Sequence, residues 1–335
     1  VGPQSAGAVP GPVCYAKGGE TVTVTDANVV LGYLNQQHLV GGALPIEAER
    51  ARAAFKAQVA DPLGLPVEEA AHGAFRIAAS NMIRAIRAIS SERGRDPRTF
   101  ALFAFGGNGP LFACEMAKTL DMKRVVIPPS PGLFSAFGLL YADLEHHYSR
   151  TLRRVTQEAD AAEIATAWGE LEGQARAQLL ADGVAAADME VRRAAALHYK
   201  GQSFELVVPA PDGAIDKGFL DQLADAFGAE HERVYGHRAG PEEPVELVSI
   251  QVGAASSADS GGVPERVVPS RPEPEPGPPR QVFFGREHGF VETPIVRRSD
   301  LEGGRAGPLI VEEYDATCVV PPGAKASLDG GGNIV

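Results

Sequence analysis

The segment that begins at residue 100 restricts the fold more than any other part of this sequence. An apolar stretch at 100–105 runs into a glycine turn, and a helical stretch at 110–120, a short apolar stretch at 124–127 and a second helical stretch follow. Strands that alternate with helices in this way are joined by crossovers, which place the strands parallel in one sheet. The sequence therefore predicts an α/β fold with a mostly parallel sheet.

Two segments before residue 100 also carry clear patterns. From residue 67 to residue 90 apolar side chains recur every three or four positions, which predicts one long amphipathic helix that ends before Gly94. Nearer the start, the stretch 21–25 is expected to form a strand. The polar residues Asp26 and Asn28 are then expected in a turn that leads into a short helix.

A change of pattern near residue 150 predicts a second domain. An acidic helix with apolar residues on one face between Ile164 and Leu179 comes first, and strands follow. A chain of 335 residues is long enough for about two domains. We therefore assign 1–150 to an α/β core and 151–335 to an α+β domain, in which the proline-rich stretch 259–280 is expected to be an exposed linker.

Composition excludes several classes of protein. The net charge is −12, and no run of Lys and Arg could neutralise successive phosphates of a nucleic acid. The apolar stretches are far shorter than the roughly 20 residues that span a bilayer. The chain begins at Val1 without a signal peptide, which indicates a fragment or a processed chain. Three scattered cysteines and histidines without metal-ligand spacing predict a cytoplasmic protein with no metal site of its own.

The glycine turn is the strongest candidate for a binding site. Gly106, Gly107, Asn108, Gly109 and Pro110 follow an apolar strand and open a helix, and such glycines let the backbone approach a ligand closely. The turn lacks the Lys-Ser/Thr ending of a P-loop and does not match G-x-G-x-x-G. We therefore expect a platform for a purine or ribose rather than a phosphate cradle, with a tight turn that binds nothing as the alternative.

Asp26 and Asn28 are candidate catalytic residues. Their polar turn beside a strand end is a common place for groups that meet a metal-bound phosphate or orient water. An Asx-turn or a helix cap is the alternative. Cys14 could be a nucleophile or a packed thiol.

Other polar clusters receive structural interpretations. His231 and His237 lie near the end of an apparent helix, where capping or packing is expected. The carboxylates of 312–315 are expected to form a solvated surface turn.

Taken together, eight segments resemble the hydantoinase A/oxoprolinase family in their order along nearly the whole chain. These segments are VGPQSAG at 1–7, PGPVCY at 10–15, TVTDAN at 23–28, FGGNGP at 105–110, PPSPG at 128–132, YKGQSFEL at 199–206, HERVYG at 231–236 and GPLIVEEYDAT at 307–317.

The resemblance implies part of an actin/hexokinase-like (ribonuclease H-like) ATPase core and a family C-terminal domain. Members of the family use ATP and Mg²⁺ to phosphorylate a cyclic amide, an imide or a ketone oxygen before ring opening or carboxylation. By this resemblance, the turn 106–110 would hold adenosine, whereas Asp-Gly-Gly-Thr-type phosphate loops and most Mg²⁺ ligands would belong to a missing N-terminal half. Phe112 stands where the family often has histidine.

The function implied is an ATP-dependent hydrolase acting on a hydantoin, 5-oxoproline or similar cyclic amide, inactive as this fragment alone. Its partners would be a hydantoinase B/oxoprolinase B-type subunit and the missing half. An acetone-carboxylase-like carboxylase subunit is the alternative enzyme. A non-catalytic assembly module is the alternative from another class.

Overall fold

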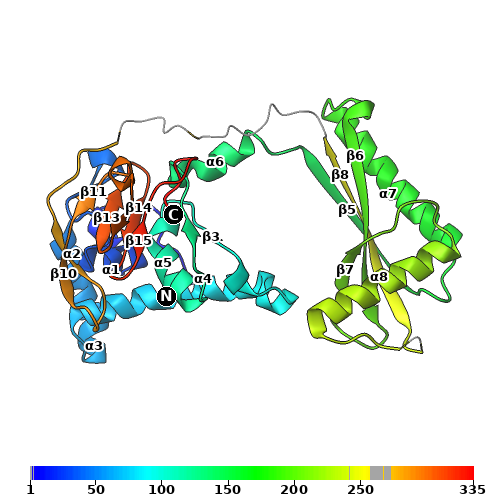
Figure 1. Ribbon diagram of the computed structural model, residues 1–335, viewed down its shortest axis with the longest axis horizontal. Helices are drawn as coiled ribbons and strands as arrows, with labels where there is room; N and C mark the ends of the chain where they lie inside the picture. The colour runs from blue at the N-terminus through cyan, green and yellow to red at the C-terminus, as the bar shows by residue number, and fades with distance from the viewer. Residues whose placement is uncertain (1, 3, 241, 257–266, 268–272) are drawn as a thin grey trace. The chain divides into compact units, whose positions relative to one another are not determined.

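The computed structural model describes residues 2, 4–240, 242–256, 267 and 273–335 (Figure 1). The chain divides into two compact units, one formed by Val1–Leu140 with Pro264–Val335 and the other by Tyr141–Val263. Each unit has its own apolar core. None of the helices built from the described residues combines the length and the apolar character needed to cross a membrane.

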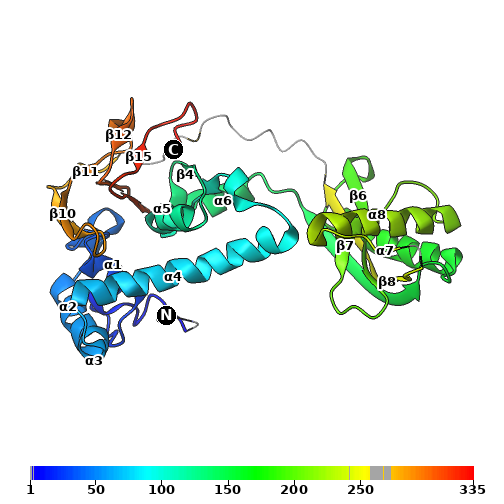
Figure 2. The same ribbon diagram turned by 60° about the horizontal axis from the view of Figure 1, so that its bottom comes forward.

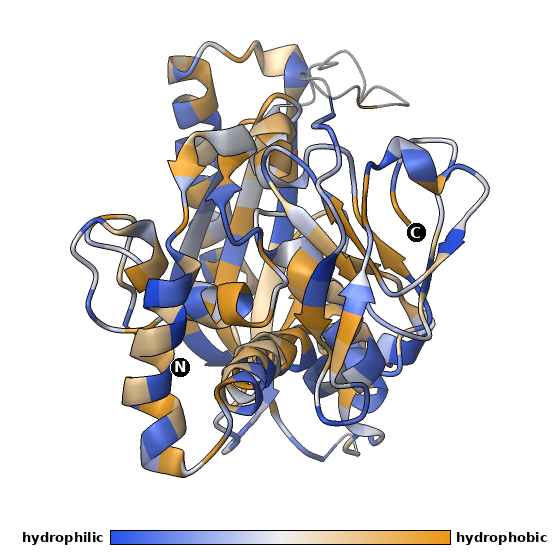
Figure 3. Cartoon of the chain, turned by 90° about the vertical axis from the view of Figure 1, so that its left-hand side faces the viewer, coloured by the Kyte–Doolittle hydropathy of each residue, from blue (hydrophilic) through white to orange (hydrophobic). Residues whose placement is uncertain are grey.

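The first unit contains the predicted long helix. Helix α4, Val67–Ile89, begins after Pro66 and runs unbroken in Figure 2. It buries Ala71, Phe75 and Ala79 at a spacing of four residues, so one stripe faces the core. The other helices of this unit are α1 (Val24–Val30), α2 (Ala48–Phe55), α3 (Asp61–Leu63), α5 (Gly109–Thr119) and α6 (Phe134–Leu139). The helices carry apolar and polar positions side by side (Figure 3), as elements with one buried face do.

The parallel sheet is smaller than the alternation of elements predicts. Strand β3 (Leu102–Phe103) pairs in parallel with β4 (Val125–Val126), with Leu102 opposite Val125, and α5 forms the crossover between them. This sheet has two strands. The parallel pairing predicted for this segment is confirmed, whereas most of the other described strand pairs are antiparallel.

The residues after 280 return to the first unit. Its remaining strands are β1 (His38–Leu39), β2 (Leu44–Pro45), β9 (Arg280–Phe283), β10 (Phe290–Thr293), β11 (Ile295–Val296), β12 (Arg305–Ala306), β13 (Leu309–Glu312), β14 (Thr317–Val320) and β15 (Lys325–Ala326). Phe283 and Ile310 share one core with Phe75 of α4. Residues that are distant in sequence therefore bury their apolar surface together in this unit.

The second unit is an α+β sandwich of one sheet and two helices. Its four strands are antiparallel in the order β5-β8-β6-β7: β5 (Glu145–Val155), β8 (Val245–Ser256), β6 (Met189–Tyr199) and β7 (Leu206–Pro209). Helices α7 (Ala161–Ala181) and α8 (Lys217–Tyr235) pack on this sheet. The predicted face of α7 is confirmed, because Ile164, Trp168 and Leu179 are all fully buried. Most of the proline-rich stretch 259–280 lies outside the described residues.

Candidate functional site

The glycine turn lies at the carboxyl end of β3, directly before α5. Ala104 N donates a hydrogen bond to the Val126 carbonyl at 2.8 Å, and Gly106 N donates to the Pro131 carbonyl at 2.7 Å. Gly106 has φ +83°, in the left-handed region that favours glycine. The turn is therefore fixed to the neighbouring strand and loop by its backbone, and the carboxyl edge of a parallel pair is the usual place for a ligand in α/β sheets.

Open space lies beside the first two glycines. A Cβ atom at Gly106 would meet no atom within 4 Å, and one at Gly107 would meet only the Asp315 carbonyl oxygen, at 3.5 Å. Asn108, the N-cap residue of α5, makes no side-chain cap hydrogen bond. The backbone of the turn and the positive end of the helix dipole are thus accessible to a group from outside.

Asp315 forms the neighbouring wall of the turn. A Cβ atom at Gly132 would lie 2.6 Å from the Asp315 carbonyl oxygen and 2.9 Å from Oδ2, so only glycine allows this approach. The Oδ2 atom is buried and has no hydrogen-bond partner among the described residues. A carboxylate oxygen in this state is available to a donor other than those of the described residues.

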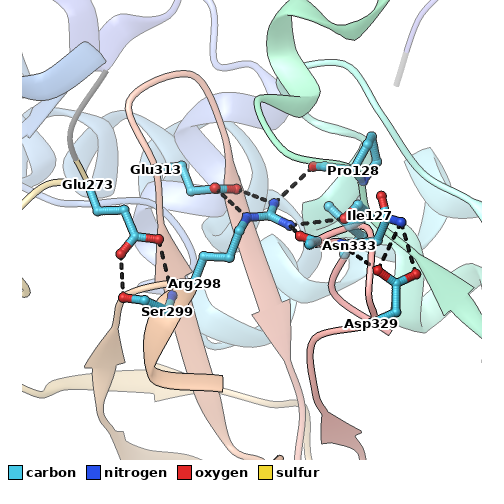
Figure 4. A network of polar contacts seen from close by, with 9 residues as sticks. Ile127, Pro128, Glu273, Arg298, Ser299, Glu313, Asp329 and Asn333 are labelled. Carbon is cyan, nitrogen blue, oxygen red and sulfur yellow. Dashed lines mark hydrogen bonds and ion pairs between the residues drawn. The ribbon is translucent and has the colours of Figure 1, made fainter. Parts of the chain in front are cut away.

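Arg298 ties the elements around the turn together (Figure 4). Its side chain is almost completely buried, and Nε and Nη2 donate to the two carboxylate oxygens of Glu313 at 2.7 and 2.8 Å. The same guanidinium donates to the carbonyls of Ile127, Pro128 and Gly332 at 2.9–3.1 Å. It therefore joins the loop that follows β4 to the turn that contains Asp315.

The expectation of a solvated turn at 312–315 is wrong. Glu313 is held by Arg298, and Glu312 accepts hydrogen bonds from Arg280 and from Asn35 Nδ2. Sequence reasoning missed Arg298 altogether. The only hint is a pair of arginines directly after the apolar stretch 295–296, which does not distinguish a buried side chain from an exposed one.

Asp26 lies in the first turn of α1 rather than in a polar turn after a strand. Thr23 is the N-cap residue of that helix, so the expected strand at 21–25 is wrong, and Thr23 and Asp26 form a capping box. The buried Asp26 carboxylate accepts hydrogen bonds from Val13 N, Cys14 N and both Thr23 N and Thr23 Oγ1 at 2.8–3.2 Å. The carboxylate holds the loop 12–15 against α1.

Asn28 is buried on the same helix. Its side chain is 1% exposed, and Oδ1 has no hydrogen-bond partner in the described parts of the chain. Its backbone carbonyl accepts from Tyr33 N and Leu34 N, which ends the helix. Asn28 therefore has a free acceptor, unlike Asp26.

Cys14, Cys318 and His231 are packed in the interior of the protein. Burial, followed by the negative charge of Asp26, raises the pKa of Cys14, so the thiol is not activated as a nucleophile. Burial raises the pKa of Cys318 well above its ordinary value as well. His231 is buried and its Nδ1 lies 2.9 Å from the His237 carbonyl, in agreement with the expected packing role.

Phe112 occupies a core position. Its ring stacks on Phe75 of α4 with centroids 4.6 Å apart and an interplanar angle of 12°. A histidine at position 112 would remove one ring of this buried stacked pair. In the described stretches of the chain no three His, Cys, Asp or Glu side chains gather closely enough to hold a metal ion.

Two family models match the chain one after the other. The hydantoinase/oxoprolinase model matches residues 1–148, and the model of the hydantoinase/oxoprolinase C-terminal domain matches residues 152–331. The chain belongs to the hydantoinase/oxoprolinase family. The glycine turn of this family member lies in the first matched part, and Arg298 and Asp315 lie in the second.

Known relatives agree with this membership. The caprolactamase subunit alpha of Pseudomonas jessenii is 33% identical over 335 residues, covering 98% of this chain and 48% of that protein. The acetone carboxylase beta subunit of Xanthobacter autotrophicus is 33% identical over 347 residues, covering 98% of this chain and 48% of that protein.

A solved structure confirms the α/β fold of this family member. The crystal structure of ATP-dependent caprolactamase from Pseudomonas jessenii matches with a TM-score of 0.80 at 32% identity, over 100% of this chain and 49% of that chain. The chain therefore spans about half the length of the curated relatives it matches.

Proposed function

We propose that this chain is the nucleotide-binding part of an ATP-dependent enzyme that phosphorylates a cyclic amide or imide before the ring opens. The observation that carries the proposal is the glycine turn at the carboxyl end of β3, with open space beside Gly106 and Gly107 and an uncapped helix behind it. A glycine turn in this position lets a nucleoside lie close to the backbone. Membership of the family and the ATP-dependent caprolactamase among its relatives support ATP as the nucleotide.

The residues of this chain would bind and orient the nucleotide rather than break bonds. Gly106, Gly107, Asn108, Gly109 and Pro110 would form the platform, and the free Oδ2 of Asp315 would accept a hydrogen bond from the ligand. When bound, ATP would supply the phosphoryl group that makes the amide carbon electrophilic. Ligands for Mg²⁺ and the phosphates would come from the part of the family polypeptide that residues 1–335 do not match.

A catalytic role for Asp26 and Asn28 remains a proposal with a direct test. In the complete enzyme, Asp26→Asn should reduce turnover about 100-fold if the carboxylate acts on the substrate or on a metal-bound water. The assay must be run well below the melting temperature, because the capping box is weakened in the same variant. Near-normal turnover would leave Asp26 with its structural role alone.

The glycine platform is tested by two alanine variants of the complete enzyme. Gly107→Ala adds a methyl group that meets only an ordinary contact at 3.5 Å, so the fold should persist while nucleotide affinity falls about tenfold or more. Gly106→Ala is the contrasting variant, because its φ of +83° disfavours alanine and stability should fall as well. Unchanged ATP and ADP affinity of a folded Gly107→Ala enzyme, measured by calorimetry, would contradict the nucleotide assignment.

An acetone-carboxylase-like function is the second candidate, because the acetone carboxylase beta subunit matches the chain over the same span. A screen of hydantoins, 5-oxoproline, caprolactam and small ketones for substrate-stimulated ADP release would separate the two chemistries. It should use the complete assembly with a B-type partner subunit. We expect residues 1–335 alone to hydrolyse ATP no faster than buffer, and robust turnover by the isolated chain would contradict the need for the other half.

A further inference from the structure

A cluster of aromatic side chains is exposed on the first unit. Phe103 and Phe105 at the end of β3 are 44% and 45% exposed, and Phe134 and Phe137 of α6 lie beside them. The ring centroids of Phe103, Phe105 and Phe134 are 5.3–5.9 Å apart, and those of Phe134 and Phe137 are 5.7 Å apart. We call these four residues, with the half-exposed Leu133, the aromatic patch.

The aromatic patch covers one face of the parallel strand pair. Side chains alternate along a strand, so Phe103 and Phe105 share a face, while Ala104 points the other way and is buried with Ala113 of α5. Parallel sheets occur almost only with both faces covered. Here one face packs on the core and the other presents contiguous aromatic rings.

The sheet is also too small to be complete. It consists of β3 and β4, with two residues paired in each strand. Sheets in globular proteins usually have four to six strands, and a pair of strands alone is marginal in water. A surface of this kind, apolar and next to a short parallel pair, is typical of a face that another segment covers.

The length of the relatives indicates which segment this is. The match spans 98% of this chain and 48% of the caprolactamase subunit alpha, so about half of that polypeptide lies outside the matched region. We propose that this other half packs on the aromatic patch and covers the exposed face of β3 and β4. The proposal extends the proposed function by naming the surface that joins the two halves, and it does not require that either half binds ATP.

For the test, the other half of the polypeptide is produced as a separate chain from the same source. Its binding to residues 1–335 is measured by calorimetry without nucleotide. The double variant Phe103→Ser/Phe105→Ser removes the centre of the patch. The matched control is Phe204→Ser, a phenylalanine 81% exposed in the second unit. We expect the wild-type chain and the control to form a one-to-one complex, and the double variant to bind on the order of 100-fold more weakly, as for aromatic residues at the centre of an interface.

If something other than the other half of the polypeptide covers the aromatic patch, the experiments give different results. If residues 141–256 of the same chain cover it, the isolated wild-type chain does not bind the apolar dye ANS through the patch, and the double variant leaves dye binding unchanged. If a second copy covers it, the isolated wild-type chain is a dimer in light scattering and the double variant is a monomer. Either result, the absence of a wild-type complex, or equal binding by the double variant overturns the proposal. A complex that forms normally but hydrolyses no ATP contradicts the proposed function and leaves this inference intact.

Discussion

Two segments of the first unit carry buried carboxylates with opposite hydrogen bonding: the first turn of α1, which contains Asp26, and the turn 312–315. Asp26 and the residues bonded to it, Val13, Cys14 and Thr23, are called the Asp26 corner. The two oxygens of the Asp26 carboxylate accept four hydrogen bonds from these residues. The 312–315 turn ends in Asp315, whose buried Oδ2 has no partner in the described residues. The sequence pattern leaves the first open as a catalytic group or a helix cap, and it favours a solvated turn for the second.

The two carboxylates differ in the hydrogen-bond partners that the described residues give them, and not in the polarity of their segments. Asp26 is a buried group whose hydrogen bonds are all made within a short stretch of chain. Asp315 is placed beside the glycine turn by a distant cation, Arg298, acting through Glu313. Four predictions test this comparison.

The largest effect is expected from Arg298→Leu. The substitution leaves Glu313 buried without its cation and removes the donors to three backbone carbonyls, which should lower the free energy of unfolding by about 3–5 kcal/mol. Chemical denaturation measures this. Arg98→Leu is the control, since its solvent-exposed ion pair with Asp96 should contribute little to the free energy of unfolding. Equal losses in the two variants would mean that the Arg298 network does not stabilise the 312–315 turn.

The second effect concerns the Asp26 corner. Asp26→Ala leaves the N–H groups of Val13 and Cys14 and the cap at Thr23 without their acceptor, and should cost about 2–4 kcal/mol. Asp26→Asn keeps one oxygen but turns an NH₂ group toward N–H donors, so we expect an intermediate loss. A melting temperature of Asp26→Ala equal to that of the wild type would show that the corner contributes nothing to stability and would restore the purely catalytic interpretation.

The third effect tests the approach of Asp315 to its loop. Gly132→Ala places a methyl group 2.6 Å from the Asp315 carbonyl oxygen, and relieving this contact should cost about 1–3 kcal/mol. Gly138→Ala is a matched control on α6, where no atom lies within 4 Å and alanine favours the helix by about 0.5–1 kcal/mol. Differential scanning calorimetry should therefore show shifts of opposite sign. A stabilised Gly132→Ala chain would mean that the two segments are farther apart than this structure has them.

The smallest effect is expected from Asp315→Asn. Oδ2 has no hydrogen bond to lose within the described chain, so the free energy of unfolding should change by less than about 0.5 kcal/mol or rise slightly. The most direct test compares the losses in free energy of unfolding caused by Asp26→Asn and by Asp315→Asn, both measured by chemical denaturation. A larger loss at Asp315 than at Asp26 would reverse it.

The parts of the fold that could be predicted are those that depend on neighbours in the sequence. The helix at Val67–Ile89 and the buried face of α7 follow from apolar residues that recur every three or four positions. The glycine turn and the helix behind it follow from the order of strand, glycines and Pro110. The threonines and valines of 21–25 favour a strand, whereas the capping box of Thr23 and Asp26 starts a helix there.

The sequence by itself determined the α/β character, the main helices and the place of the glycine turn, since periodicity and turn residues act over a few positions. Only the tertiary structure decided that the parallel sheet has two strands, that residues after 280 return to the first unit and that Asp26 is already fully bonded. The physical reason is sequence distance. Arg298 and the Ile127 carbonyl are 171 positions apart, and a hydrogen bond between them depends on the packing of every element in between.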